Sequence, residues 1–135
     1  MLLMKGNHLK IIIMKRFENK VAIITGAASG IGEATTRRFV SEGGKVVIAD
    51  HSIENADKLA TELTQSGADV RSIYFSATEL HSCKQLIEFA KKEYGQIDIL
   101  VNNVGGTNPK QDLNIEKLDI DYFDEAFHLN LCCTM

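Results

Sequence analysis

Two features of this sequence have the residue types and spacing of a nucleotide-binding site. The first is the glycine-rich stretch TGAASGIG at residues 25–32, which joins an apolar run to a helical segment. Glycines let the backbone approach a diphosphate without a Cβ clash, and the amide groups and dipole of the following helix favour its negative charge. The Ser29 hydroxyl could add a donor. The alternative is a turn that serves only tight packing of the strand against the helix.

The second feature is an acidic side chain at the end of the next apolar run. Asp50 lies 24 residues after Gly26 and 18 after Gly32, close to the offset of roughly 20 residues typical of the acid that binds an adenosine ribose. A carboxylate there accepts hydrogen bonds from the ribose hydroxyls and repels a 2′-phosphate, which favours NAD over NADP. The alternative is an exposed acid that caps the next helix, although His51 or Ser52 could do that equally well.

These residues must be positioned by strands and helices that alternate along the chain. Residues 21–24, 46–49 and 97–101 are nearly continuous apolar runs, as in parallel strands covered on both faces, and Val70, Ile73 and Phe75 mark a weaker strand. Apolar residues recur at helical spacing between these runs, and glycines follow the helical segments. The pattern is βαβαβαβ and predicts an α/β, doubly wound parallel sheet of the Rossmann type, with its ligand beyond the carboxyl ends of the strands.

Composition and charge narrow the classes of function. The chain has 135 residues, 44% of them hydrophobic, and a net charge of −3, so it lacks the positive field that gathers nucleic acid or an anionic membrane. Its apolar runs are far shorter than the roughly 20 residues of a membrane span. Cys83, Cys132 and Cys133 lack metal-site spacing, and the adjacent pair cannot form an unstrained bridge. We therefore expect no metal, no nucleic acid and no membrane as partners, and a reducing, cytoplasmic location.

The first residues differ from the rest of the chain. Residues 1–16 are basic, but their apolar stretch at residues 11–14 is shorter than the roughly seven residues of a secretory core, and no cleavage site follows it. We expect a disordered tail over residues 1–16, arising from translation that starts upstream of Met14, and a dinucleotide-binding unit over residues 17–135.

The spacing of the glycines, together with Asn102-Asn103-Val104-Gly105 after the fourth strand, resembles the short-chain dehydrogenase/reductase family over residues 19–135. Residues 16–20 and 98–110 are most similar to bacterial 7α-hydroxysteroid dehydrogenases, which implies a bile acid substrate. The resemblance implies a set of cofactor-binding residues: Thr25, Gly26, Ser29, Gly30, Ile31, Gly32, Asp50, Ser76, Ala77, Asn103, Val104 and Gly105.

Three residues are compared with the family's pattern: Val104, Ser76 and Asn130. Val104 replaces the usual alanine, a small increase in bulk. Ser76 stands where the family has an acid that binds the adenine amino group, so the bond is expected to weaken by roughly 1 kcal/mol. Asn130 matches the family's helix asparagine, which holds a water of the proton relay and is the catalytic residue expected in this chain. It falls on the apolar helix face of Phe123 and Phe127, where it needs hydrogen bonds. An ordinary, satisfied interior asparagine is the alternative.

The family's catalytic serine and its tyrosine with a lysine four residues later have no counterpart here. Tyr74, Tyr94 and Tyr122 are followed at that distance by Thr, Asp and Ala, so none has the positive charge that would lower its pKa. Because the family continues beyond this point, the resemblance implies an amino-terminal fragment, truncated after the fourth strand and within a fifth helix. We expect it to lack hydride transfer by itself and its edge strand, residues 97–101, to be prone to association.

Three functions remain open from the sequence. The first is the NAD-binding part of an oxidoreductase, homo-oligomeric when complete, that interconverts a 7α-hydroxysteroid and its ketone. The second is a dinucleotide-binding module without catalysis. The third is another short-chain oxidoreductase, or an epimerase on the same sheet, although the glycine spacing argues against the epimerase.

Overall fold

The computed structural model describes residues 2–4, 9–11, 15–108, 110–111, 116–117 and 119–131. Along the chain it places β1 (Leu2–Met4), β2 (Leu9–Ile11), β3 (Val21–Thr25), α1 (Gly30–Ser41), β4 (Lys45–Asp50), α2 (Ile53–Gln65), β5 (Val70–Tyr74), α3 (Leu80–Tyr94), β6 (Ile99–Val101) and α4 (Ile120–Asn130). Cys132 and Cys133, discussed above, lie outside the described residues.

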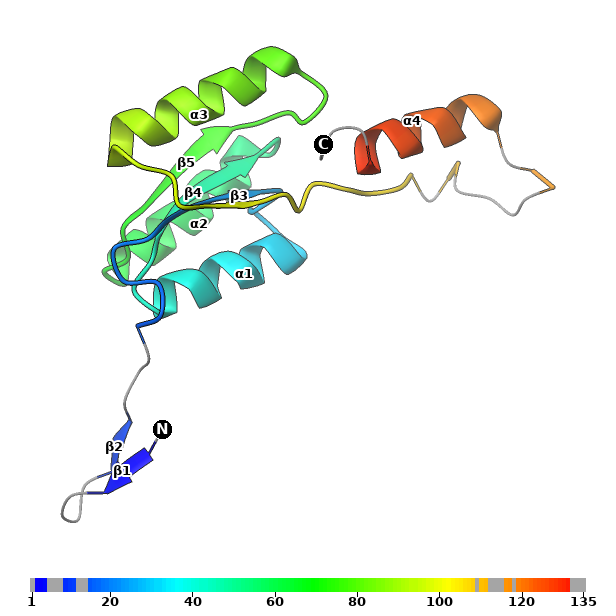
Figure 1. Cartoon of the computed structure of the whole chain (residues 1–135). Coiled ribbons are helices and arrows are strands. Elements are labelled where there is room, and N and C mark those ends of the chain that lie inside the picture. Colours follow the sequence, from blue (N-terminus) through cyan, green and yellow to red (C-terminus); the bar gives the residue numbers. More distant parts are fainter. Residues whose placement is uncertain are drawn as a thin grey trace.

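The predicted doubly wound sheet is confirmed. Strands β3 to β6 form one parallel sheet in the order β5-β4-β3-β6, so the chain reverses direction across the sheet between β5 and β6. Figure 1 shows α3 on one face of this sheet and α1 and α2 on the other. The carboxyl ends of β3 and β6 therefore meet beside each other at the point where the strand order reverses, which is where such sheets bind ligands.

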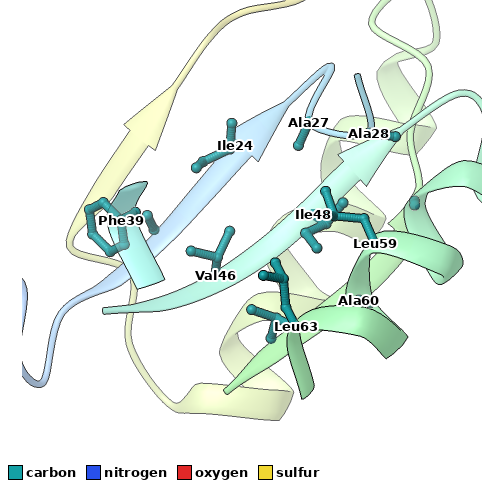
Figure 2. Packing of buried hydrophobic residues seen from close by; sticks show 12 residues of the cluster. Ile24, Ala27, Ala28, Phe39, Val46, Ile48, Leu59, Ala60 and Leu63 are labelled. Atoms are coloured by element: carbon teal, nitrogen blue, oxygen red, sulfur yellow. The ribbon is translucent and has the colours of Figure 1, made fainter. Parts of the chain in front are cut away.

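Side chains that point alternately to the two faces of the sheet along β3 and β4 form two hydrophobic cores, one on each face. Ala22, Ile24, Val46 and Ile48 pack towards α1 and α2, where Phe39 and Leu59 complete the cluster drawn in Figure 2. Ile23, Val47 and Ala49 pack on the opposite face, towards α3. Because successive side chains of a strand point to opposite faces, a strand covered on both faces must be apolar throughout. This is why residues 21–24 and 46–49 read as continuous apolar runs.

Two element predictions need correction. The last strand begins at Ile99 rather than at residue 97, because Asp98 uses its carboxylate to accept the Val21 N–H at 2.8 Å. That bond, with a further one from Lys20, holds the pKa of Asp98 below its ordinary value. The helix expected as the fifth is the fourth helix of the described chain; three helical segments precede it, so the predicted number was one too high.

Two short strands precede the main unit. β1 and β2 pair antiparallel, in a sheet separate from the main one. Arg16 contacts the main unit through hydrogen bonds from its guanidinium to the Glu42 carboxylate. Arg38 bonds the same carboxylate, and the two arginines lower the pKa of Glu42. An ion pair with a largely buried carboxylate thus anchors the chain one residue before the expected start of the domain.

Surface helices α1 and α2 are joined by an arginine. Arg37 bonds Glu33 on its own helix and Glu62 on α2, at 2.6–2.8 Å. These bonds raise the pKa of Arg37 and lower that of Glu62. Exposed ion pairs of this kind contribute little to stability, so the buried contacts of Phe39 and Leu59 fix the two helices.

Thr36 is the buried side chain of α1 whose hydroxyl lacks a hydrogen-bond partner among the described residues. A buried hydroxyl without a partner costs free energy, whereas a methyl group of the same size does not. We predict that Thr36→Val raises the free energy of unfolding by about 1 kcal/mol, measured by urea denaturation. The matched control is Thr35→Val, because the Thr35 hydroxyl donates to Ile31 at 2.7 Å. Equal effects of the two substitutions would contradict the prediction.

Candidate functional site

A cleft of about 500 Å³ lies at the carboxyl ends of the strands. The turn after β3, the end of β4, the segment after β5 and the segment after β6 all contribute to it. Its lining consists of Gly26, Ser29, Gly30, Ile31, Asp50, His51, Phe75, Ser76, Ala77, Thr78, Asn103, Val104, Gly105 and Leu129. The structure thus brings together, around one opening, all of the sequence-predicted cofactor residues except Thr25 and Gly32.

Thr25 and Gly32 lie behind the lining and hold the glycine turn in place. The Thr25 hydroxyl donates to Val101 at 3.3 Å and accepts the Asn103 N–H at 3.0 Å. The Asn103 side chain returns a bond of 3.1 Å to the Gly26 carbonyl. A Cβ on Gly32 would lie 2.0 Å from that same carbonyl oxygen. The glycine at position 32 is therefore required by packing of backbone against backbone.

The start of α1 has the form of an anion site. Ser29 is the N-cap residue in an extended conformation, and its side chain makes no capping hydrogen bond. Gly30 follows with a φ of 55°, and a Cβ there would meet nothing within 4 Å. The first N–H groups of a helix have no acceptor within the helix and carry the positive end of its dipole. This turn therefore presents donors and open space to an anionic group.

Asp50 holds two backbone segments in place and also lies on the wall of the cleft. Its Oδ2 accepts the Ala28 N–H of the glycine turn at 2.9 Å, and its Oδ1 accepts the Ser52 N–H at 2.9 Å. His51 Nδ1 lies 3.1 Å from the same Oδ1. A carboxylate has about four acceptor positions, so these contacts leave capacity for a further donor. The Asp50 side chain is 5% exposed and lies on the cleft wall.

Asn130 joins α4 to the segment after β6. Its side chain donates to the Gly106 carbonyl at 2.9 Å and accepts the Gly106 N–H at 2.9 Å, so it pairs with that backbone as a neighbouring strand would. A second donor bond reaches Ala126 at 2.8 Å. A Cβ on Gly105 would lie 2.7 Å from Asn130 Oδ1. Asn130 is exposed, as are Phe123 and Phe127 on the same helix face. These hydrogen bonds therefore join α4 to Gly106 without being required by burial, and the alternative of an ordinary interior asparagine does not hold.

The cleft also contains four residues that the sequence analysis did not assign to it: His51, Phe75, Thr78 and Leu129. Each is a chain neighbour of an assigned residue, since His51 follows Asp50, Phe75 and Thr78 flank Ser76 and Ala77, and Leu129 precedes Asn130. For the first three, the end of a strand places consecutive residues at the same opening, and Leu129 lies beside Asn130 on α4 (Ile120–Asn130), so adjacency was the available signal. Among the residues that the structure describes, no three His, Cys, Asp or Glu side chains gather as metal ligands would.

A scan against family models matches residues 20–135 to the short chain dehydrogenase family. The chain belongs to this family. The match covers the sheet, α1 to α4 and every strand end around the cleft, so the resemblance drawn from the glycine spacing is confirmed.

Two relatives within the short-chain dehydrogenases are hydroxysteroid dehydrogenases. A 7alpha-hydroxysteroid dehydrogenase of Bacteroides fragilis is 76% identical over 122 residues, which cover 90% of this chain and 47% of that protein. A 7alpha-hydroxysteroid dehydrogenase of Clostridium sardiniense is 39% identical and covers 82% and 42%, respectively. The chain therefore spans less than half the length of these relatives.

A solved structure has the same arrangement of strands and helices. It comes from Haemophilus influenza, is described as a candidate D-mannonate oxidoreductase with bound NAD, and superimposes with a TM-score of 0.77 at 30% identity. The matched region is 86% of this chain and 46% of that one. A nucleotide cofactor is thus supported for the fold around this cleft.

The packing of Gly32 against Gly26 provides a test of the glycine turn. We predict that Gly32→Ala lowers the free energy of unfolding by about 1–3 kcal/mol, because the added methyl displaces backbone rather than a flexible side chain. Gly106→Ala is the matched control, since a Cβ at that position meets nothing within 4 Å. The measurement is chemical denaturation of both variants; a Gly32→Ala protein as stable as the control would refute this account of the turn.

Proposed function

We propose that this chain supplies the NAD-binding part of an oxidoreductase that transfers a hydride between NAD and the 7α-hydroxyl or ketone of a steroid of the bile acid type. The observation that carries the proposal is the Asp50 carboxylate on the wall of a cleft whose glycine turn is open to a diphosphate. The identity of 76% with the Bacteroides fragilis enzyme supports the steroid.

The residues around the cleft fit the parts of a dinucleotide. We assign the diphosphate to the start of α1, where Gly30 leaves open space and the Ser29 hydroxyl is not used as a cap. Asp50 would bind the adenosine ribose, and Ser76 with Ala77 would border the adenine. Asn103 to Gly105 would border the nicotinamide side. When bound, the nicotinamide supplies the hydride acceptor or donor.

Charge supports NAD rather than NADP. Among the described residues, the cleft lining contains the Asp50 carboxylate and no lysine or arginine. A 2′-phosphate would lie against that carboxylate without a permanent positive charge to compensate it, which costs binding free energy. The ribose of NAD instead offers two hydroxyl donors to the same group.

Asn130 has a positioning task in this proposal, in addition to the relay water that the family resemblance implies. Its amide group holds both backbone groups of Gly106. That contact fixes the segment after β6 against α4, and with it the border of the cleft at Val104 and Gly105.

A second hollow, of about 630 Å³, adjoins the cleft and shares Thr78 and Leu129 with it. Tyr122, Ala126 and Leu129 give it an apolar wall, while Gln111, Glu125 and His128 provide polar groups. The Tyr122 hydroxyl accepts the Asn108 N–H at 2.6 Å and so fixes one side of the hollow. An apolar wall with few polar groups suits a steroid, whose rings are apolar and whose hydroxyls are few.

The proposal includes a homo-oligomer in the cytoplasm. Ile120, Phe123 and Phe127 of α4 and the C-cap residue Leu131 are exposed, and a large exposed apolar face favours a protein partner. Cys83 is a free thiol, which suits a reducing compartment. Among the described helices, none has the length and apolar character needed to cross a bilayer.

The coenzyme assignment is tested at Asp50. We predict that Asp50→Asn weakens NAD binding by about tenfold, because a charged acceptor is lost, and reduces the preference for NAD over NADP. Calorimetric titration with both coenzymes measures this, and thermal unfolding checks that the loss of the Ala28 and Ser52 bonds leaves the fold intact. Glu54→Gln, an exposed acid in the first turn of α2, is the matched control. An unchanged coenzyme preference in a folded Asp50→Asn protein would remove Asp50 from the site.

The substrate assignment is tested on the full-length gene product. We predict NADH formation, followed by absorbance, with a 7α-hydroxylated bile acid and NAD, and at least about tenfold less with the 7β epimer, since hydride transfer needs one face of the carbon aligned with the cofactor. Turnover of other secondary alcohols but of neither epimer would leave a short-chain oxidoreductase with a different substrate.

A further inference from the structure

Two neighbouring hydroxyl groups are the polar side chains at the β5 end of the cleft. Ser76 and Thr78 both line the cleft, and their hydroxyl oxygens lie 3.1 Å apart, so that either one can donate to the other. The other lining residues of this segment, Phe75 and Ala77, are apolar. Among the described lining residues, the ionisable side chains follow β4 instead. The segment after β5 therefore offers hydroxyl groups, and no charge, to a ligand.

The backbone that carries these hydroxyls is held by neighbouring elements. The Phe75 N–H donates to the Asp50 carbonyl at 2.9 Å. The Ser76 N–H donates to the buried Ser82 hydroxyl at 2.9 Å, and the Ser76 carbonyl accepts the Glu79 N–H at 3.2 Å. The main-chain polar groups of Ser76 are thus used within the fold. Its side chain lines the cleft from a fixed backbone, while its hydroxyl hydrogen is free to rotate.

The order of the strands indicates which part of a dinucleotide meets these hydroxyls. The sheet runs β5-β4-β3-β6. The diphosphate is assigned to the turn after β3, and the adenosine ribose to Asp50 at the end of β4. The next strand end in the same direction is that of β5, so the base attached to this ribose is directed towards Ser76 and Thr78. The nicotinamide half is directed the other way, towards β6.

We propose that Ser76 and Thr78 form a base site that accepts a 6-oxopurine as readily as adenine, a 6-aminopurine. The inference rests on the proposed coenzyme function of this cleft. Adenine presents a donor at its amino group and an acceptor at N1, whereas hypoxanthine presents an acceptor at O6 and a donor at N1. A hydroxyl both donates and accepts. Because the bond between the two hydroxyls can reverse its direction, the pair can offer a complement to either pattern.

A carboxylate at position 76 would behave differently, because it only accepts hydrogen bonds. It would bind the amino group of adenine but repel the lone pairs of O6 in hypoxanthine. An asparagine of nearly the same size has both an N–H donor and a carbonyl acceptor. Ser76→Asp and Ser76→Asn are therefore a matched pair of variants, of which the aspartate alone should distinguish the two bases.

The test compares the binding of NAD and of nicotinamide hypoxanthine dinucleotide, which differs from NAD at this edge of the base, to the purified protein by calorimetry. We expect the two dissociation constants of the wild type to agree within about threefold. In Ser76→Asp the hypoxanthine dinucleotide should bind about tenfold more weakly than NAD, because O6 then lacks a donor. Ser76→Asn should keep the ratio of the wild type. Thermal unfolding checks that each variant is folded.

A further variant separates the hydroxyl pair from a neighbouring acid. Glu79 is exposed, precedes α3 and does not line the cleft, so Glu79→Gln should leave the ratio unchanged. A wild-type preference for NAD of about tenfold or more overturns the inference, and so does a ratio unchanged by Ser76→Asp when both dinucleotides bind. Either result leaves the coenzyme function standing. Failure of NAD to bind the folded protein overturns the proposed function, and this inference with it.

Discussion

The hydrogen bonds of Asn103 hold the whole opening together. Its backbone N–H bonds the Thr25 hydroxyl and its side chain bonds the Gly26 carbonyl, so the end of β6 is fastened to the turn after β3. Gly32 packs against the same carbonyl from the helix side. These contacts hold the backbone of the glycine turn and the start of α1 in fixed positions. A binding site made of backbone donors needs this rigidity, because the donors have no side chain that could adjust.

Asp50 shows how one side chain can serve the fold and the site together. Its carboxylate bonds the N–H groups of Ala28 in the glycine turn and of Ser52 before α2, and is almost buried. The acid on the cleft wall thus also supports the glycine turn. A substitution at Asp50 therefore removes two hydrogen bonds of the fold as well as a carboxylate from the cleft wall.

Much of this arrangement could be predicted from the sequence, because the signals are local. Continuous apolar runs at residues 21–24 and 46–49 indicated buried parallel strands, and the glycine spacing with Asp50 indicated a nucleotide cleft. What could not be predicted depends on contacts distant along the chain. β6 is shortened by the Asp98 bond to Val21, and Thr25 and Gly32 act behind the lining because of contacts with residues after β6.

The distance along the chain between bonded partners also orders the assembly of the cleft. The bond from Asp50 to Ala28 closes a loop of 22 residues, within one strand-helix-strand unit, whereas those from Asn103 to Gly26 and Thr25 close loops of 77 and 78. Longer loops cost more entropy to close and slow folding. The bonds of Asp50 are therefore expected to form earlier in folding than those of Asn103, which require β6 to dock. In that order of events, the Asp50 wall of the cleft takes shape before the Asn103 wall.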